Sequence, residues 1–590
     1  MNGRPHITAN SDEIAEAIIA RVGKKIVLGL PLGLGKAPHI ANALYARAAA
    51  DSSIKLTIFT ALTLEKPRYK NVLERRFLEP VIERLFGGWP ELAYAKALRA
   101  GTLAPNVEVN EFFFLAGQWL GVSQAQQSYI SANYTHASRY LIERGVNVIA
   151  QLVAKRDGRY SLSGNTDITL DLFRARAEGR ANFLVTGQVN AELPFMPGEG
   201  DLAAEDFDYL LDGPSTEFPL FAPPHEPIGF SEYAIGLHTA RLVPDGGTLQ
   251  IGIGKDGDAV AQALIMRHRD NAAFRKALAA LSPQADGHLA PFEAGLHGLS
   301  EMLVSSFLQL IEAGVVKREV DGALLNAGFF LGPKGFYRAL REMPDAQREK
   351  IRMTAISFTN QLYGDEDAKR RARVGARFIN STMMMTLLGA AVSDGLEDGR
   401  VVSGVGGQYD FFAQAFALPD ARAVLTLNAT RGRGAKTTSN IRWSYGHETI
   451  PRHLRDVVVS EYGVADLRGR SDEEVVAALL AIADSRFQNE LLTRAKEAGK
   501  IAKTYEIPSA HRDNTPERIA RALSPFLETG HLPAFPFGCD FDETERRLLP
   551  ALEYLDAASQ SPLALLNLAM RGWPSGEDAA LARMNLDRPQ

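Results

Sequence analysis

The chain has 590 residues, of which 65 are basic and 70 acidic, so its formal net charge at pH 7 is only −5. Hydrophobic residues make up 46% and charged residues 23%, a soluble globular composition that excludes collagen, coiled coils and disordered tails. The balanced charge gives no reason to expect a nucleic-acid partner, and the length predicts two to four domains of roughly 150 residues each.

The cysteine content and the apolar runs bear on where the protein works. Cys539 is the only cysteine, so no intrachain disulfide can form, which fits a reducing cytoplasm. The first ten residues are polar and lack the apolar stretch of a secretory signal. The apolar runs are far shorter than the about 20 residues needed to cross a bilayer. We therefore expect a cytoplasmic protein with no membrane partner.

Helices and short apolar strands alternate in the first part of the chain. Helical spacing predicts helices at 12–22 and 40–49, and apolar runs predict strands at 25–30, 55–60 and 146–152. This alternation is typical of an α/β domain with a mostly parallel sheet.

The same alternation restarts after a segment with five prolines at 213–227, which is typical of a linker. The pattern predicts helices at 234–241 and 258–267 and strands at 248–253, 352–357, 401–403, 423–428 and 457–460. Beyond about residue 505 only helices are expected, at 515–528 and 543–570. We therefore predict an α/β fold of two successive open domains with mostly parallel sheets, 1–225 and 226–505, followed by a helical C-terminal extension, 506–590.

Three of the loops rich in glycine could approach a ligand closely. Residues 252–257 read Gly-Ile-Gly-Lys-Asp-Gly, a literal dinucleotide-binding pattern. A helix follows them, however, where that fingerprint needs a second strand ending in an acidic residue. Residues 33–36, Gly-Leu-Gly-Lys, lack the spacing of a P-loop. Residues 404–407, Gly-Val-Gly-Gly, would expose backbone N–H groups that suit an oxyanion or a phosphate.

Glu301 stands just before a predicted helix at 303–313. Taken alone, this segment is typical of a helix N-terminus, with Ser300 as the cap and Glu301 in the first turn. No zinc motif is present, because the chain has one cysteine and Pro451 stands where an H-E-x-x-H motif from His447 needs its second histidine. We predict no metal site.

Several separated segments resemble the acetyl-CoA hydrolase/transferase family, which includes acetate, succinate, butyrate and 4-hydroxybutyrate CoA-transferases. They are DGGTLQIGIG at 245–254, SEM at 300–302 with LIEAGV at 310–315, NS at 380–381, SGVGGQYDF at 403–411 and SEYGVADLRG at 460–469. The resemblance runs in family order over roughly residues 20–500. The chain departs from the family in four ways. Gly298 and Leu299 are extra, and Ser305-Ser306 replaces an Asp-Gly pair. Residues 431–436, RGRGAK, stand where the family tends to have a plainer run of small residues and lysine, and the chain is longer than the compact members.

The resemblance implies a CoA-transferase fold and ping-pong kinetics, in which Glu301 attacks an acyl-CoA and then carries CoA as a glutamyl thioester. It also implies that Gly406 and Gly407 donate backbone N–H groups to the oxyanion. The residues expected to bind the acyl group, the carboxylate or CoA are Gly252, Ile253, Gly254, Gly404, Gln408, Arg431, Arg433 and Lys436.

The expected substrates are an acyl-CoA and a small carboxylic acid, with coenzyme A as part of the substrate and no tightly bound cofactor. A homodimer is expected from the resemblance. Three alternatives stay open: an acyl-CoA hydrolase that uses water at the same site, a nicotinamide-dependent dehydrogenase that uses residues 252–257, and a CoA-binding or assembly protein without catalysis. Residues 506–590 carry no readable function.

Overall fold

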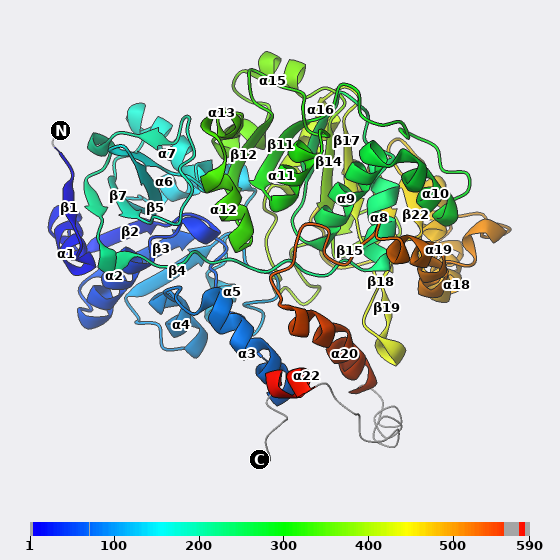
Figure 1. The fold of residues 1–590 in the computed structure, drawn as a ribbon, viewed down its shortest axis with the longest axis horizontal. Coiled ribbons are helices and arrows are strands. Elements are labelled where there is room, and N and C mark those ends of the chain that lie inside the picture. Colours follow the sequence, from blue (N-terminus) through cyan, green and yellow to red (C-terminus); the bar gives the residue numbers. More distant parts are fainter. Residues whose placement is uncertain (1–3, 70, 560–577, 585–590) are drawn as a thin grey trace.

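The computed structural model describes residues 4–69, 71–559 and 578–584. Figure 1 shows two α/β halves side by side, the first in blue to cyan and the second in green to orange. The C-terminal segment runs back across both of them. The predicted α/β class with mostly parallel sheets and a helical C-terminal region is confirmed.

The first half is built on a nine-stranded sheet. The order along its main path is β1-β9-β7-β5-β2-β3-β4, with every neighbouring pair parallel. Strands β6 and β8 extend it through antiparallel pairs. The strands are β1 (His6–Thr8), β2 (Lys25–Gly29), β3 (Lys55–Thr60), β4 (Val107–Glu111), β5 (Val148–Arg156), β6 (Arg159–Ser161), β7 (Leu184–Val189), β8 (Asp201–Leu202) and β9 (Tyr209–Leu211). Its helices are α1 (Ser11–Val22), α2 (Pro38–Ala50), α3 (Val72–Phe86), α4 (Ala93–Ala100), α5 (Ser123–Gln127), α6 (Ala137–Glu143) and α7 (Asp167–Ala177).

The second half is built on an eight-stranded sheet in the order β13-β12-β11-β10-β14-β17-β21-β22, parallel except for its last pair. The strands are β10 (Thr248–Ile251), β11 (His297–Leu303), β12 (Leu325–Phe330), β13 (Ile351–Met353), β14 (Arg377–Ser381), β17 (Arg422–Thr426), β21 (Val457–Ser460) and β22 (Gly463–Asp466). Short strands form a three-stranded sheet and a hairpin: β15 (Met384–Thr386), β16 (Ala391–Val392) and β20 (Ile441–Arg442), then β18 (Thr430–Arg431) and β19 (Thr438–Ser439).

Helices cover this second sheet as well. They are α8 (Phe230–Ala240), α9 (Lys255–Arg269), α10 (Asn271–Leu281), α11 (Ser305–Glu312), α12 (Lys334–Glu342), α13 (Asp345–Arg348), α14 (Ile356–Thr359), α15 (Glu366–Ala372), α16 (Gln408–Ala417), α17 (Asp472–Ala481) and α18 (Ser485–Glu497). None of the helices in the described part of the chain is long and apolar enough to span a bilayer.

One hydrophobic core runs through the first half and continues into the second, where it takes in residues of β10, β11 and β12. A second core lies wholly within residues 299–507. Strands β7 and β12 are buried along their whole length, as expected for strands of a parallel sheet that are covered on both faces. The shared core fixes the two halves against each other, and strand β11 lies where they meet.

The C-terminal segment contacts both halves. Its helices are α19 (Pro516–Glu528), α20 (Glu543–Ser559) and α22 (Asp578–Arg583). Helix α19 packs on α8 and α10. Glu545 of α20 accepts from Arg84 of α3 at 2.6 Å and from Arg583 of α22 at 2.7 Å. The extension therefore ties the first sheet's helices to the second half (Figure 1).

Three sequence predictions of local structure are wrong. Strand β13 ends at Met353, and the rest of the predicted strand at 352–357 turns into helix α14, because Asp171 holds both the backbone N–H and the hydroxyl of Ser357. The predicted strand at 401–403 contains only a single bridge, from Val401 to Gly395. Glu301 lies on strand β11 instead of in a helix first turn. The part of the predicted helix 543–570 beyond residue 559 lies outside the described residues.

Candidate active site

Glu301 lies on β11, between the parallel strands β10 and β12. The residues before and after it, Ser300 and Met302, are buried. Its carboxyl group has two donors: Nδ2 of Asn360 donates to Oε2 at 2.8 Å, and the backbone N–H of Gly407 donates to the same carboxyl. Because a strand in the middle of a sheet is hydrogen-bonded on both sides, the backbone that carries the Glu301 side chain is held in place.

Gly406 and Gly407 form the wall against this carboxylate. A Cβ at Gly407 would stand 1.7 Å from Oε2 of Glu301 and 2.2 Å from Nδ2 of Asn360, so no side chain fits there. Gly406 has φ of 57°, and its Cβ position lies 3.9 Å from Oε1 of Glu301. The structure therefore brings Glu301 and the two predicted oxyanion glycines together.

The first half of the chain braces this glycine loop. The backbone N–H of Tyr134 donates to the carbonyl of Gly406 at 2.8 Å. The hydroxyl of Thr135 donates to Oδ1 of Asp410 at 3.0 Å, and the hydroxyl of Tyr134 donates to Asp167. The site is thus assembled from both α/β halves, and its geometry depends on how they pack.

Three carboxyl groups share this interior. Burial raises the pKa of Glu301 to about 8; the hydrogen bond from Asn360 opposes this rise, while the nearby charges of Asp410 and Asp167 add to it. Burial also raises the pKa of Asp410 to about 7 and that of Asp167 to about 6. Near neutral pH these groups therefore share protons, and their titrations are linked.

A lysine from the first glycine loop lies deep in the same region. Burial lowers the pKa of Lys36 to about 7, against the opposing charges of Glu111 and Asp167. Its Nζ donates to the carbonyls of Ala61 at 2.6 Å and Leu62 at 3.2 Å. The loop at residues 33–36, whose spacing does not fit a P-loop, thus places the buried amine of Lys36 near the carboxyl group of Asp167.

The loop after β10 reaches the edge of the sheet where Glu301 stands. β10 pairs with β11 in the register Thr248 to His297 and ends at Ile251, and a Cβ at Gly252 would meet the backbone of Ile379 and Asn380 on β14. Ile253 is 56% exposed and Gly254 has φ of 87°. Helices α9 and α10 follow, and the next strand begins only at His297, so the spacing of a dinucleotide fingerprint is not met.

The remaining predicted binding residues lie on two segments. Gln408 is the first residue of α16, and its Nε2 donates to the carbonyl of Ser381 at 3.0 Å. Gly404 packs against the backbone of Phe112, where a Cβ would come within 2.7 Å of the carbonyl oxygen. Both belong to the loop that contacts Glu301, and their roles in binding stay predictions.

The predicted cationic residues lie on the β18–β19 hairpin, which projects from the body of the second half (Figure 1). Arg431 is exposed, and its Nη1 lies 3.2 Å from Sδ of Met384. Arg433 and Lys436 occupy the hairpin turn. The neighbours of Glu301 described above include none of the three, so their contact with CoA stays a prediction.

Sequence reasoning missed the residues that fix and tune Glu301. Asp410 was visible, since it lies in the SGVGGQYDF segment, but nothing in the sequence marked it as an ionisable neighbour of Glu301. Asn360, Tyr134 and Asp167 stand outside every recognised motif. No cluster of His, Cys, Asp or Glu that could hold a metal ion occurs among residues 4–69, 71–559 and 578–584.

The structure is thus an α/β protein in which a partly buried glutamate packs against a glycine loop. Residues 332–495 match the family model of the acetyl-CoA hydrolase/transferase C-terminal domain. The family resemblance drawn from the separated motifs is thereby confirmed, together with the enzyme class to which the relatives belong.

Curated relatives agree with this assignment. The chain is 27% identical over 322 residues to a 4-hydroxybutyrate coenzyme A transferase of Clostridium kluyveri, covering 53% of this chain and 65% of that protein. It is 25% identical over 406 residues to a succinyl-CoA:cyclohexane-1-carboxylate CoA transferase of Geobacter metallireducens, covering 68% of this chain and 82% of that protein.

Solved structures share the fold. RipA from Yersinia pestis superposes with a TM-score of 0.59 at 20% identity, over 84% of this chain and 98% of its own. A 4-hydroxybutyrate CoA-transferase from Porphyromonas gingivalis superposes with a TM-score of 0.55 at 20% identity and the same coverage. These matches establish the architecture of both halves.

Proposed function

We propose that this protein is an acyl-CoA:carboxylate CoA-transferase that works through Glu301. The observation that carries the proposal is a largely buried carboxylate held against the N–H of Gly407 on the central strand β11. The named relatives support it, because they are CoA-transferases.

The reaction runs through two anhydrides. The Glu301 carboxylate attacks the thioester carbon of an acyl-CoA, and CoA thiolate leaves as a mixed anhydride forms. The thiolate then attacks the glutamyl carbonyl, which releases the first carboxylic acid and leaves CoA as a thioester on Glu301. The carboxylate of the second acid attacks that thioester and expels CoA thiolate, which takes the new acyl group and frees Glu301. Atoms and charge balance at each step, and no cofactor is consumed.

The donors at the carboxylate suit these steps. Each attack on the glutamyl carbonyl places negative charge on an oxygen of Glu301, where the Gly407 N–H and the Asn360 amide already donate. Because these groups are fixed by α16 and by the turn after α14, they need little reorganisation as charge develops.

The raised pKa of Glu301 lowers the fraction of the carboxyl group that is ionised and raises the nucleophilicity of the ionised form. At pH 7 much of the carboxyl population is protonated, since burial raises its pKa to about 8. The ionised fraction is a stronger nucleophile than an ordinary carboxylate because basicity and nucleophilicity rise together. Activity should therefore increase with pH through the range around 7 to 8.

The proposal is tested by trapping the thioester. The protein is mixed with acetyl-CoA, butyryl-CoA or succinyl-CoA and treated with borohydride. Its intact mass is measured by mass spectrometry, and a digest then locates the residue whose mass has changed. Reduction of a glutamyl thioester to an alcohol removes about 14 Da from Glu301, as expected for covalent catalysis. Glu301→Gln should show no loss.

Transfer is separated from hydrolysis by following thioester loss with and without an acceptor acid. Loss that requires acetate, succinate or butyrate supports the transferase. Loss at an equal rate without any acceptor would identify a hydrolase, and an unchanged mass for every acyl-CoA tried would contradict covalent catalysis by Glu301.

A further inference from the structure

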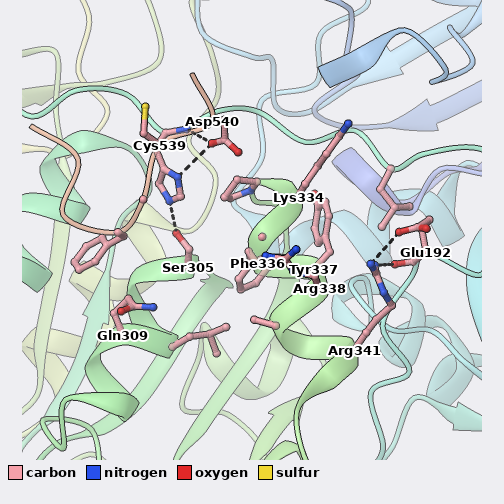
Figure 2. A pocket seen from close by; sticks show the side chains of 18 of the residues that line it. Glu192, Ser305, Gln309, Lys334, Phe336, Tyr337, Arg338, Arg341, Cys539 and Asp540 are labelled. Atoms are coloured by element: carbon pink, nitrogen blue, oxygen red, sulfur yellow. Dashed lines mark hydrogen bonds and ion pairs between the residues drawn. The ribbon is translucent and has the colours of Figure 1, made fainter. Parts of the chain in front are cut away.

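A second set of interacting side chains lies outside the Glu301 site. Figure 2 shows Ser305 at the start of α11 and Asp540 from the loop before α20. His225, from the segment between the two sheets, contacts both of them. Nε2 of His225 lies 3.1 Å from Oγ of Ser305. Nδ1 of His225 lies 3.4 Å from Oδ2 of Asp540, which also accepts the His225 backbone N–H at 3.1 Å.

These three residues line one cavity of about 710 Å³. Phe336, Tyr337 and Leu308 supply apolar wall. Lys334, Arg338 and Arg341 add positive charge, and Arg341 forms an ion pair at 2.9 Å with Glu192, which also lines the cavity (Figure 2). A volume of this size accommodates a small organic substrate, since ligand pockets typically span about 300–1,000 Å³. The cavity therefore combines room for a substrate, a hydroxyl nucleophile and a base.

We propose that Ser305, His225 and Asp540 form a catalytic triad that hydrolyses a carboxylic ester or thioester bearing an anionic group. The order of contacts is the one that such a triad requires: the carboxylate faces Nδ1, and the serine hydroxyl faces Nε2. The ring is held in place, because the side chains of His225 and Asp540 are only 12% and 17% exposed. Burial acts to raise the pKa of Asp540, but the hydrogen bonds from the His225 ring and backbone outweigh it and lower that pKa, so the orienting group is charged.

Two helix N-termini supply N–H donors to the cavity. Helix α11 begins at Ser305 after Val304, and helix α12 begins at Lys334 after Pro333; neither preceding residue provides a side-chain cap. The first N–H groups of a helix have no partner within it, and they favour negative charge. The start of α11 can hold the oxyanion on an acyl carbon bonded to Ser305. The start of α12 has open space at Gly335, where an anionic substrate group can approach the backbone.

The hydrolytic cycle balances without a co-reactant other than water. Oγ of Ser305 bonds to the acyl carbon as its proton moves to Nε2 of His225. The tetrahedral adduct collapses, and the leaving alkoxide or thiolate takes that proton. Water then gives a proton to Nε2 as its oxygen attacks the acyl-serine. The second tetrahedral adduct collapses, Oγ of Ser305 leaves and takes that proton back from Nε2, and the acid is released.

The triad depends on two features that set this chain apart. Ser305 stands where the family segment has an Asp-Gly pair, and Asp540 lies in the C-terminal extension, beyond the matched domain at 332–495. The extension, whose sequence carried no readable function, thus completes this site with a carboxylate.

The test uses the full-length protein with Cys539 replaced by Ala, because that thiol also lines the cavity and could be acylated nonspecifically. The chain is treated with a fluorophosphonate probe, and the modified residue is mapped by mass spectrometry. Labelling is expected on Ser305. It should disappear in Ser305→Ala and slow in Asp540→Asn, which keeps the shape but removes the charge.

Hydrolysis is measured with 4-nitrophenyl hydrogen adipate and the neutral 4-nitrophenyl hexanoate. The adipate ester should be preferred, and its rate should fall at least about 100-fold in Ser305→Ala and Asp540→Asn. Arg338→Ala should reduce the preference for the anionic ester. Wild-type rates in Ser305→Ala, or a probe adduct at any other residue with Ser305 unmodified, would overturn the proposal.

Folding and the first site are controlled separately. Glu301→Gln should keep probe labelling and ester hydrolysis, since Glu301 takes no part in this triad. Ser305→Ala should keep CoA transfer at the wild-type rate, which also shows that the variant folds. Loss of ester hydrolysis in Glu301→Gln would assign that activity to the Glu301 site and contradict the triad.

Discussion

Glu301 and Ser305 are four residues apart on the segment that runs from β11 into α11, yet they enter opposite kinds of surroundings. Glu301 lies among buried carboxyl groups, and its pKa is raised to about 8. Ser305 faces a cavity lined by three cations, by the carboxylates of Glu192 and Asp540, and by two helix N-termini. The junction between β11 and α11 therefore carries two proposed acyl acceptors, Glu301 and Ser305. Their different surroundings decide which reaction each of them can perform.

The largest expected effect comes from adding a side chain at Gly407, in the glycine loop that packs against Glu301. In Gly407→Ala the new methyl group would stand 1.7 Å from Oε2 of Glu301, so either the loop or the carboxylate must move. Loss of one oxyanion donor alone costs about 100- to 1,000-fold in kcat. We therefore expect CoA transfer to fall by at least about 1,000-fold in steady-state assays.

A matched control for this change is Gly121→Ala, because a Cβ at Gly121 meets nothing within 4 Å. That variant should transfer CoA normally. If Gly407→Ala were to keep more than a tenth of wild-type kcat, Gly407 would not be an oxyanion donor. Hydrolysis at the Ser305 cavity should be unchanged in both variants, which keeps the two sites distinct.

The next effect concerns the amide that holds Glu301. Asn360→Ala removes the 2.8 Å hydrogen bond that lowers the carboxyl pKa. A hydrogen bond to a charged group contributes about 1.5–3 kcal/mol, so kcat/KM for transfer should fall about 10- to 100-fold. The rise of kcat/KM with pH should also move to higher pH, because less of the carboxyl is ionised. A profile that keeps its midpoint would show that Asn360 acts by packing alone.

The contrast between the two sites also shows what sequence can and cannot supply. The segments 55–60 and 457–460 predicted strands correctly, because their apolar and β-branched residues favour a strand that is covered on both faces. A serine followed by an acidic residue is typical of a helix N-terminus, so Ser300 and Glu301 predict a helix start rather than a strand. Pairing with β10 and β12 buries the segment 297–303 in the sheet regardless of that pattern.

The partners of Glu301 could not be predicted because they arrive from distant segments. Asn360 lies 59 residues beyond Glu301, and Tyr134 belongs to the other α/β half. Gly35 is required because a Cβ there would meet Oδ1 of Asn165 at 2.3 Å, a contact that no local spacing encodes. The motifs indicated which residue reacts, whereas the packing of the halves decides how acidic it is.

A smaller effect is expected from removing one neighbouring charge. Asp410→Asn deletes a carboxylate that raises the pKa of Glu301, so the midpoint of the kcat/KM profile should move to lower pH. The shift should be opposite in sign to that of Asn360→Ala. An unchanged midpoint in Asp410→Asn would mean that burial alone sets the acidity of Glu301.

The smallest effect is on stability. Glu301 has a folded-state pKa of about 8 against an ordinary value of 4.5, so the native state keeps a proton that the unfolded state loses between these limits. The unfolding free energy must therefore fall as pH rises from about 4.5 to 8. Glu301→Gln keeps the shape but removes the titration, so the difference between its Tm and that of the wild type should become more positive by at least about 1 °C from pH 5 to pH 8. The exposed Glu143→Gln should show no such trend. Parallel Tm curves for Glu301→Gln and wild type would show that water reaches the carboxyl freely, in which case the contrast between a desolvated Glu301 and a cavity-facing Ser305 would not hold.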